Sequence, residues 1–267
     1  MPRITKDGMR LLTLLFSLLF IFSGSGAQTL KAATSSPADR VVIAKKRIVI
    51  VRQGKLVKDF PDRKRAVINY PLITSGASSA AALRKVRSLL QLKNIFDTSL
   101  AEYKSDTWLD EFDYEVNYNR NSILDITFTQ SGMGAYPDEH TRHFAINLKT
   151  GDVIKARDVF KPSALKTLAE MADRKLRAER EENLKAVAQD DLTAEDKQNL
   201  REQLEGLKFQ IDNLDEFSIS DKGVTFLYDA GFPHAIQAIE PVGKYFFSYG
   251  ELRSFIKPEG PLGSFAR

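Results

Sequence analysis

The sequence predicts an α+β fold: a mainly antiparallel sheet with packed helices and a charged helical insertion. Most of the predicted strands follow one another through tight turns, which is how antiparallel neighbours are usually connected. The predicted helices come in blocks instead of alternating strictly with strands, which disfavours a parallel α/β sheet. The 267-residue chain is 43% hydrophobic and 28% charged, which is typical of a globular protein.

Composition excludes several classes of function. The chain has no cysteine, which excludes disulfide bonds, a thiolate nucleophile, a cysteine-bound zinc site, an iron–sulfur cluster and a lipid anchor on an N-terminal cysteine. Its 39 Lys and Arg exceed its 35 Asp and Glu by only four charges, so we expect no nucleic-acid partner.

The first segment, 1–27, has the layout of a secretory signal peptide. An apolar run over 11–22 follows three basic residues and leads to small residues up to Ala27, with a second cleavage site after Ala33. The alternative is an N-terminal membrane anchor, but a span needs about 20 apolar residues and this run is shorter. We therefore expect a periplasmic or secreted protein without a membrane span after signal cleavage, and a flexible leader over 28–39.

A single α+β domain is predicted over 40–260. It begins with a hairpin over 40–60, in which β-branched residues over 47–51 form one strand and the second strand restarts at Leu56.

A further strand over 66–70 is expected to end at Pro71 or shortly after, because proline lacks the N–H group that a sheet ladder needs. One helix is then predicted from about Ser79 to Tyr103, since apolar residues recur there at helical spacing.

Alternating apolar and polar residues over 112–118 and 123–129 predict an antiparallel hairpin with its turn at 120–122. Tyr118 falls on the apolar side of the first strand. Asp125 and Thr127 fall on the side of the second strand that is opposite its apolar residues.

The later elements follow from the same signals. Two charged helices are predicted here. The first begins at a proline, and the second begins with a capping-box-like pattern at Thr193 and ends at Gly206. Turn residues delimit the strands. The predicted elements are strands over 142–148, 153–154, 217–220, 224–228 and 244–248, helices over 163–188, 193–206 and 249–256, and a loose tail over 261–267.

The order of short motifs from about residue 66 to 260 resembles a domain of unknown function found in exported bacterial proteins. The motifs that carry the resemblance lie at 70–73, 123–128, 132–137, 144–151, 158–160, 217–219, 223–228 and 249–252. The domain occurs in the extracellular part of lysozyme-sensing anti-sigma factors of the RsiV type and beside the catalytic domain of some secreted peptidoglycan deacetylases. The resemblance implies a stand-alone copy of that envelope-facing module.

The chain departs from this family at one position. The family tends to have Gly-Ala-His-Pro where this chain has Gly134-Ala135-Tyr136-Pro137. A proton-transfer role of that histidine would be lost here, because a phenol titrates near pH 10.

One cluster, 138–143, contains residue types that bind metals. His140 and His143 would share a face on a helix, but the segment is predicted as a loop leading into a strand, where residues three apart point to opposite faces. We therefore expect no metal, no other cofactor and no catalytic residue here. His234 is predicted as a loop residue without an assignable partner.

Charge is unevenly distributed. Residues 40–65 hold ten Lys and Arg and two Asp, whereas 100–140 hold nine Asp and Glu and two Lys and Arg. The two segments are expected to neutralise each other or to protect edge strands. The alternative is a recognition surface for a charged envelope partner.

The leading hypothesis is an exported, non-catalytic binding module of the cell envelope, with a lysozyme-like muramidase or peptidoglycan as the partner that the resemblance implies. Its candidate binding residues lie in the segment 132–140: Gly134, Tyr136, Asp138 and His140. Glycine and proline flanking an aromatic residue would either present it as an anchor or merely shape the turn. One alternative is a cell-wall hydrolase that uses either a metal or acidic residues such as Asp113 and Glu115. The other alternative is a purely structural envelope protein.

Overall fold

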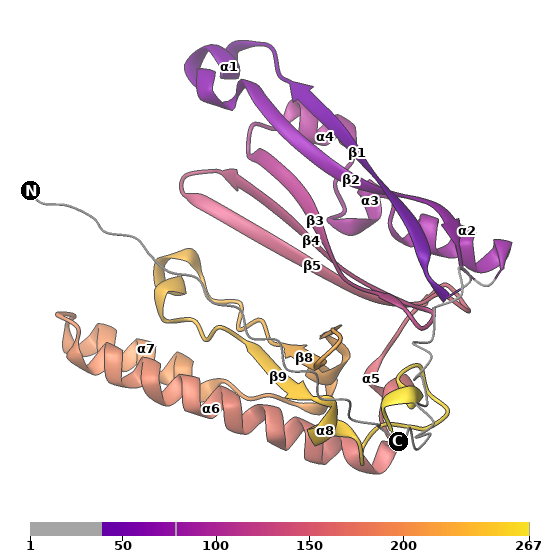
Figure 1. Ribbon diagram of the computed structural model, residues 1–267. Helices are drawn as coiled ribbons and strands as arrows, with labels where there is room; N and C mark the ends of the chain where they lie inside the picture. The colour runs from indigo at the N-terminus through magenta and orange to yellow at the C-terminus, as the bar shows by residue number, and fades with distance from the viewer. Residues whose placement is uncertain (1–38, 78, 267) are drawn as a thin grey trace, which may run out of the picture. The chain divides into compact units, whose positions relative to one another are not determined.

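The computed structural model describes residues 39–77 and 79–266, so the predicted signal peptide over 1–27 and almost all of the leader lie outside the described residues (Figure 1). The described residues form one compact unit. Within the described part of the chain, no helix combines the length and the apolar composition needed to cross a membrane.

The architecture is α+β, as the sequence predicts. A six-stranded sheet has the order β1-β2-β3-β4-β5-β6, and only the β2–β3 pairing, at Val67 and Ile68, is parallel. Its strands are β1 (Val41–Val51), β2 (Arg65–Gly76), β3 (Leu109–Arg120), β4 (Ile123–Met133), β5 (Pro137–Asn147) and β6 (Asp152–Val153). A separate antiparallel sheet contains β7 (Phe217–Ile219), β8 (Gly223–Leu227) and β9 (Lys244–Ser248).

The predicted hairpin over 40–60 is wrong. β1 pairs with β2 along its whole length, and the connection contains a short helix α1 (Lys55–Asp59) and a 3-10 turn η2 (Pro61–Lys64). β2 also continues through Pro71, which the sequence predicts as an end. Because β2 pairs with β3 only at Val67 and Ile68, the missing N–H of Pro71 costs no bond to β3.

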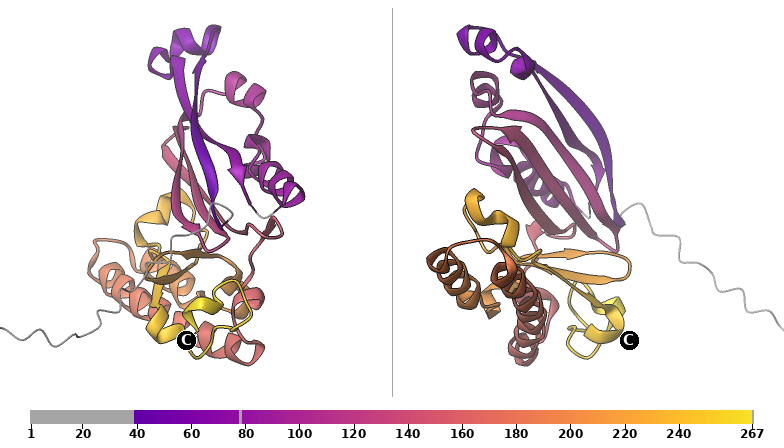
Figure 2. Two further views of the ribbon diagram at one scale, coloured as in Figure 1. Left: turned by 45° about the vertical axis from the view of Figure 1, so that its right-hand side comes forward. Right: turned by 90° about the vertical axis from the view of Figure 1, so that its left-hand side faces the viewer.

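Three short helices replace the single helix predicted over 79–103: α2 (Ala80–Leu89), α3 (Leu92–Ile95) and α4 (Leu100–Ser105). The Ser79 side chain caps α2, and a capping box between Ser99 and Glu102 starts α4. Between them Asp97 has a φ of 53°, which a continuous right-handed helix does not allow. The helices lie on one side of the six-stranded sheet (Figure 2) and share a core with it that includes Val86, Ile95, Phe112 and Phe128.

The hairpin of β3 and β4 forms as predicted, with a two-residue turn in which Asn121 and Ser122 both have positive φ. The alternation of β3, however, fails near its end. The register shifts between Val116 and Tyr118, so that Tyr118 lies opposite Asp125 and joins a second core instead of the core around Phe112.

The charged insertion is confirmed. β5 and β6 are followed by α5 (Ala156–Val159), the 3-10 turn η3 (Pro162–Ala164), α6 (Leu165–Gln189) and α7 (Ala194–Gly206). Thr193 caps α7 as its spacing to Asp196 predicts. The remaining elements are η4 (Ile211–Asp215), η5 (His234–Ile239), α8 (Tyr249–Leu252) and η6 (Gly263–Phe265).

The second core packs α6 against the three-stranded sheet and includes Leu168, Leu176, Phe226 and Phe247. It also takes in Tyr118, Ile123 and Ala145 from the six-stranded sheet. The tail predicted to be loose is packed instead: Leu262 is buried in this core, and Phe265 stacks on Tyr249 with ring centroids 3.7 Å apart.

Candidate functional site

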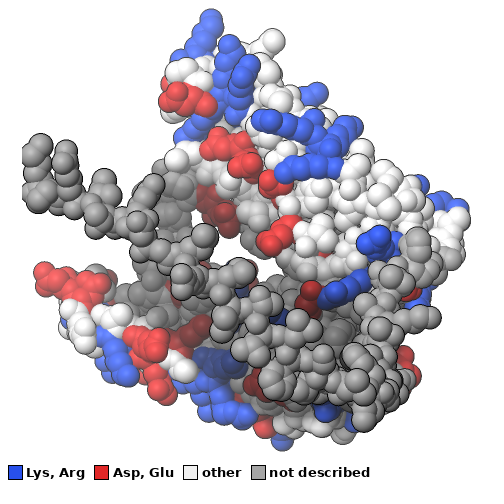
Figure 3. Space-filling view, viewed as in Figure 1, with Lys and Arg blue, Asp and Glu red and all other residues white. Residues whose placement is uncertain are grey.

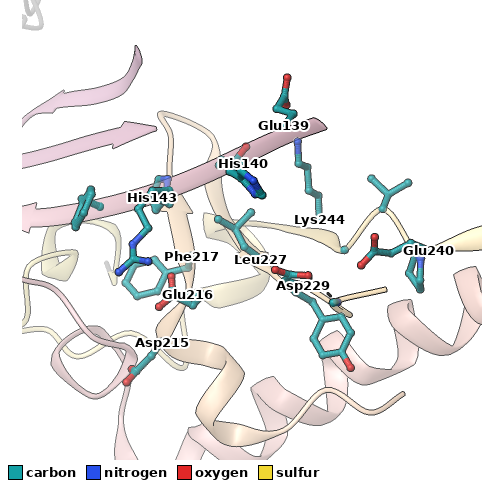
Figure 4. Close-up of a pocket in the computed structure, with 18 of the residues that line it drawn as sticks. Glu139, His140, His143, Asp215, Glu216, Phe217, Leu227, Asp229, Glu240 and Lys244 are labelled. Atoms are coloured by element: carbon teal, nitrogen blue, oxygen red, sulfur yellow. Dashed lines mark hydrogen bonds between the residues drawn. The ribbon is translucent and has the colours of Figure 1, made fainter. Parts of the chain in front are cut away.

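A cleft of about 1000 Å³ lies along one edge of β5. Its other walls come from η4 and β7, the end of β8, η5 and the start of β9 (Figure 4). In the described part of the chain, the outer edge of β5 pairs with β6 at Ile146 and Asn147, and the Ala145 carbonyl accepts a hydrogen bond from the Ile154 N–H at 2.7 Å. Within the same described part, residues 137–144 have no strand on the cleft side. Backbone N–H and C=O groups of an unpaired strand edge can pair with an added strand.

Acidic side chains predominate in the cleft. Three cationic residues line it, Arg142, Lys155 and Lys244, together with all three histidines of the chain. Six carboxylate residues line it: Asp138, Glu139, Asp215, Glu216, Asp229 and Glu240. With neutral histidines the lining therefore carries three more negative than positive charges, which favours a cationic ligand.

Some of these charges are already paired within the protein. Lys155 Nζ lies 3.9 Å from an Asp215 carboxylate oxygen and 4.0 Å from one of Glu216. Lys244 extends from the start of β9 toward Glu139 on β5 (Figure 4) but forms no ion pair with another described residue. Long, exposed pairs such as those of Lys155 contribute little to stability and can exchange their partners for a ligand.

The segment 132–140, predicted as a loop, is mostly strand. β4 continues to Met133 and β5 begins at Pro137, so only residues 134–136 form the turn. Gly134 accepts a hydrogen bond from Arg63 at 3.2 Å, and the Gly134 N–H donates to the Tyr136 carbonyl at 3.0 Å. Gly134 thus shapes the turn, and Tyr136 presents the only large side chain among residues 134–136.

Tyr136 is 62% exposed, and its ring stacks on His234 with centroids 4.7 Å apart. His234 begins η5 and lines the cleft, so this contact joins the β4–β5 turn to the cleft rim. Of the candidate residues, Asp138 and His140 line the cleft itself. The partner of His234 could not be predicted from the sequence, because Tyr136 lies in a distant segment.

The two histidines of β5 occupy different faces of the strand, as their spacing predicts. His140 lies opposite Gln130, beside the Trp108 ring at 5.3 Å, and its Nε2 is 3.3 Å from Asp138. His143 instead lies opposite Thr127 on the other face. Among the described residues, no group of three or more His, Asp or Glu side chains is arranged to hold a metal ion.

A buried polar network surrounds His143. Its Nε2 lies 3.1 Å from Asp125 Oδ2 and its Nδ1 lies 3.0 Å from the Thr127 hydroxyl. Thr127 accepts a bond from the Asn117 side chain at 2.8 Å, so its hydroxyl hydrogen is available for Nδ1 and the ring N–H faces Asp125. The β3 bulge places Asn117 and Tyr118 on the same side of the sheet, which brings Asn117 into the network.

The chain of hydroxyl, imidazole and carboxylate has the groups of a nucleophilic triad. Its surroundings indicate a structural role. Asp125 is fully buried and also accepts bonds from Ser218 Oγ and the Ile219 N–H on β7. His143 lines the cleft, whereas Thr127 and Asp125 do not. The alternation of β4 predicts the face of the strand that carries Asp125 and Thr127. It does not predict that β7 covers this face.

No family model matches the chain, and no curated protein matches it. Its fold is found in solved structures. A member of the DUF3298 family from Bacteroides fragilis has a TM-score of 0.50 at 14% identity, covering 87% of this chain and 99% of that one. A DUF3298 family protein from Pseudomonas aeruginosa has a TM-score of 0.51 at 13% identity, covering 84% and 97%. The neighbours therefore share the fold and are members of a family defined as a domain of unknown function.

Proposed function

We propose that the chain is an exported, non-catalytic binding module of the cell envelope, and that the cleft along β5 is its binding site. The observation that carries the proposal is the unpaired edge of β5, which faces an acidic cleft of ligand-binding size. Tyr136 and Val242, 62% and 73% exposed, add apolar surface beside these polar groups. An exposed aromatic residue beside a strand edge is a common anchor in protein recognition.

The partner that fits this cleft best is an extended cationic segment of another protein. The strand edge supplies main-chain donors and acceptors, and the excess of carboxylates favours Lys and Arg side chains. Of the two partners that the resemblance implies, a muramidase of the lysozyme type, which is commonly a basic protein, matches these features better than peptidoglycan.

A direct titration tests the proposal. The wild-type chain is titrated by calorimetry with a purified basic lysozyme-type muramidase and, separately, with soluble peptidoglycan fragments. Tyr136→Ala is expected to weaken muramidase binding about 30-fold, because truncating an aromatic anchor costs about 2 kcal/mol or more. Phe60→Ala is the matched control, since Phe60 is 48% exposed and lies outside the cleft.

The outcomes separate the alternatives. Equal binding of the wild type and Tyr136→Ala would mean that Tyr136 only shapes the turn. Binding of the fragments alone would identify peptidoglycan as the partner and contradict the charge argument. Absence of binding to both would remove the proposed partners.

A cell-wall hydrolase is the second candidate, because Thr127, His143 and Asp125 form a hydroxyl–imidazole–carboxylate chain. Incubation with purified peptidoglycan and chromatography of the released fragments tests it. We expect no release by the wild-type chain. Release that is abolished by Thr127→Val would establish catalysis.

Export has its own test. N-terminal sequencing of the secreted or periplasmic fraction is expected to begin at Gln28, or at Thr34 if the second cleavage site is used. A membrane-embedded form that begins at Met1 would contradict export by a cleaved signal.

A further inference from the structure

The end of the β1–β2 pair carries a concentrated positive charge. We define the arm tip as residues 49–65, which comprise the end of β1, α1, η2 and the start of β2. Residues 52–65 hold six Lys and Arg and two Asp, a net charge of 6 − 2 = +4, equal to the net charge of the whole chain. Figure 3 shows the basic side chains gathered around α1.

Four of these six cations are available to a ligand, whereas Arg52 is buried. Lys55, Lys58, Lys64 and Arg65 are exposed, and none of them forms an ion pair with another described residue. Lys45, farther along β1, contrasts with them because it pairs with Asp113 at 3.2 Å. The mutual neutralisation expected from the sequence therefore reaches Lys45 but not these four cations of the arm tip.

Apolar side chains are exposed at the same tip. Phe60 is 48% exposed, and Val49 and Val51 are 49% and 50% exposed. The Arg63 guanidinium lies 4.9 Å from the centre of the Phe60 ring. Exposed aromatic and aliphatic side chains among Lys and Arg are typical of surfaces that bind the interface of a membrane.

The tip is held in place by Arg52. Its backbone N–H donates to the Lys64 carbonyl at 2.9 Å, its Nη1 to the Arg63 carbonyl at 2.8 Å and its Nη2 to the Leu109 carbonyl at 2.6 Å. These bonds tie both sides of the tip to the start of β3. A fixed tip presents its cations without the ordering cost of a flexible loop.

We propose that the arm tip binds the surface of an anionic lipid bilayer, with its Lys and Arg at the lipid phosphates and Phe60 among the headgroups. Each cation near an anionic bilayer adds to binding, and the attraction falls with salt. A soluble polyanion would use the cations alone, whereas a bilayer also accommodates Phe60, Val49 and Val51. This surface lies outside the proposed cleft and does not depend on its function.

Vesicle co-sedimentation of the full chain tests the proposal. Vesicles of phosphatidylcholine alone are compared with vesicles that also contain phosphatidylglycerol. Lys55→Glu/Lys58→Glu is expected to lower partitioning onto the anionic vesicles at least about tenfold. Phe60→Ala is expected to lower it about threefold. The apolar run over 11–22 and the three basic residues before it also bind vesicles, but they are present in every variant, so the difference between a variant and the wild type measures the arm tip alone.

Lys185→Glu/Arg201→Glu is the matched control, because it makes the same change in net charge at exposed positions of α6 and α7. We expect it to retain anionic-vesicle binding. Equal loss in both double variants would overturn the proposal in favour of a non-specific charge effect. Equal wild-type binding to both vesicle types would also overturn it, as would full competition by polyphosphate together with unchanged binding of Phe60→Ala. Circular dichroism confirms that each variant is folded.

Discussion

Asp125 and Arg52 are both buried charged residues, but the protein compensates them differently. Asp125 is 0% exposed, and four groups donate to its two oxygens: Asn117 Nδ2, Ser218 Oγ, the Ile219 N–H and His143 Nε2. Arg52 is 2% exposed, and its side chain donates only to the carbonyls of Arg63 and Leu109. Within the described residues its Nε has no partner.

Position explains the difference. Asp125 lies on β4, and donors reach it from β3, β5 and β7. Arg52 lies just after β1 at the edge of the sheet, and its side-chain hydrogen bonds go to backbone carbonyls. Burial lowers the pKa of Arg52, and Asp106 and Asp110 oppose that effect from a distance. The burial of a charge costs less free energy when more hydrogen bonds compensate it.

Asp125→Ala is expected to have the largest effect. The substitution leaves up to four buried donors without an acceptor, each of which costs free energy. The free energy of unfolding should fall by about 3–5 kcal/mol, a large part of the stability of an ordinary domain. Urea unfolding, followed by circular dichroism and by the fluorescence of the single tryptophan, Trp108, measures it.

Asp125→Asn is the control for shape. It retains one acceptor oxygen but turns an amide group toward the donors, so a loss of about half that size is expected. A loss below about 1 kcal/mol for Asp125→Ala would mean that water replaces the carboxylate and that the network does not hold the two sheets together.

The alternation of apolar and polar residues explains how much of the Asp125 network could be predicted from the sequence. The alternation over 123–129 placed Asp125 and Thr127 opposite the apolar residues of β4, and this is correct. The pattern does not say what covers that face. The cover is β7, and the Ile219 N–H that contacts Asp125 is 94 residues away in the chain. Contacts at such separations leave no periodicity in a single sequence.

Two predictions about where elements end are wrong for the same reason, because distant contacts decide these ends. The sequence predicts a turn between the strand over 47–51 and the strand that restarts at Leu56, and Gly54 in this interval does have a φ of 104°. The chain then enters α1 instead of a strand, and Arg52 turns inward to Leu109. The tail over 261–267 reads as loose from its Gly and Pro content, but Leu262 and Phe265 pack on partners that the local sequence does not specify. For the candidate binding residues, the sequence predicts a turn around Tyr136, which the structure contains at 134–136. It does not predict the cleft beside this turn.

Tyr103 extends the comparison to a buried group that is neutral at ordinary pH. Its hydroxyl donates to Gln130 Oε1 at 2.7 Å, and burial raises its pKa from 10.0 to about 12. The folded chain therefore holds the phenol proton between pH 10 and 12, where the unfolded chain has lost it. The contribution is present below pH 10 and is lost as pH rises through the folded pKa, by about 2 kcal/mol at pH 12.

Urea unfolding at pH 9 and at pH 12 measures this effect. Tyr103→Phe is the control: its stability should fall by about 2 kcal/mol less than that of the wild type over this range. Tyr245 and Tyr249, whose pKa values burial also raises, remain in both proteins and cancel. Equal falls in both proteins would contradict the assignment to Tyr103.

Arg52→Met is expected to cost less than Asp125→Ala. The substitution removes two hydrogen bonds and leaves the carbonyls of Arg63 and Leu109 without these donors. It also removes a poorly compensated buried charge, and methionine can fill the space of the side chain. The two effects oppose each other, so a net loss of about 1–2 kcal/mol in urea unfolding is expected. A loss of unfolding free energy as large as that of Asp125→Ala would show that the number of compensating hydrogen bonds does not distinguish the two sites.

Ser218→Ala is expected to have the smallest effect, and it tests whether the donors to Asp125 contribute separately. Ser218 Oγ donates to Asp125 Oδ1 at 3.1 Å, and Asn117 donates to the same oxygen at 2.8 Å. After the substitution every oxygen of Asp125 still accepts a bond, so unfolding should be easier by only about 1 kcal/mol. Ser254→Ala, at an exposed position, is the control and should change stability by less than about 0.5 kcal/mol. A loss near that of Asp125→Ala would mean that the four donors act as one cooperative network, because losing a single bond would then disable the others.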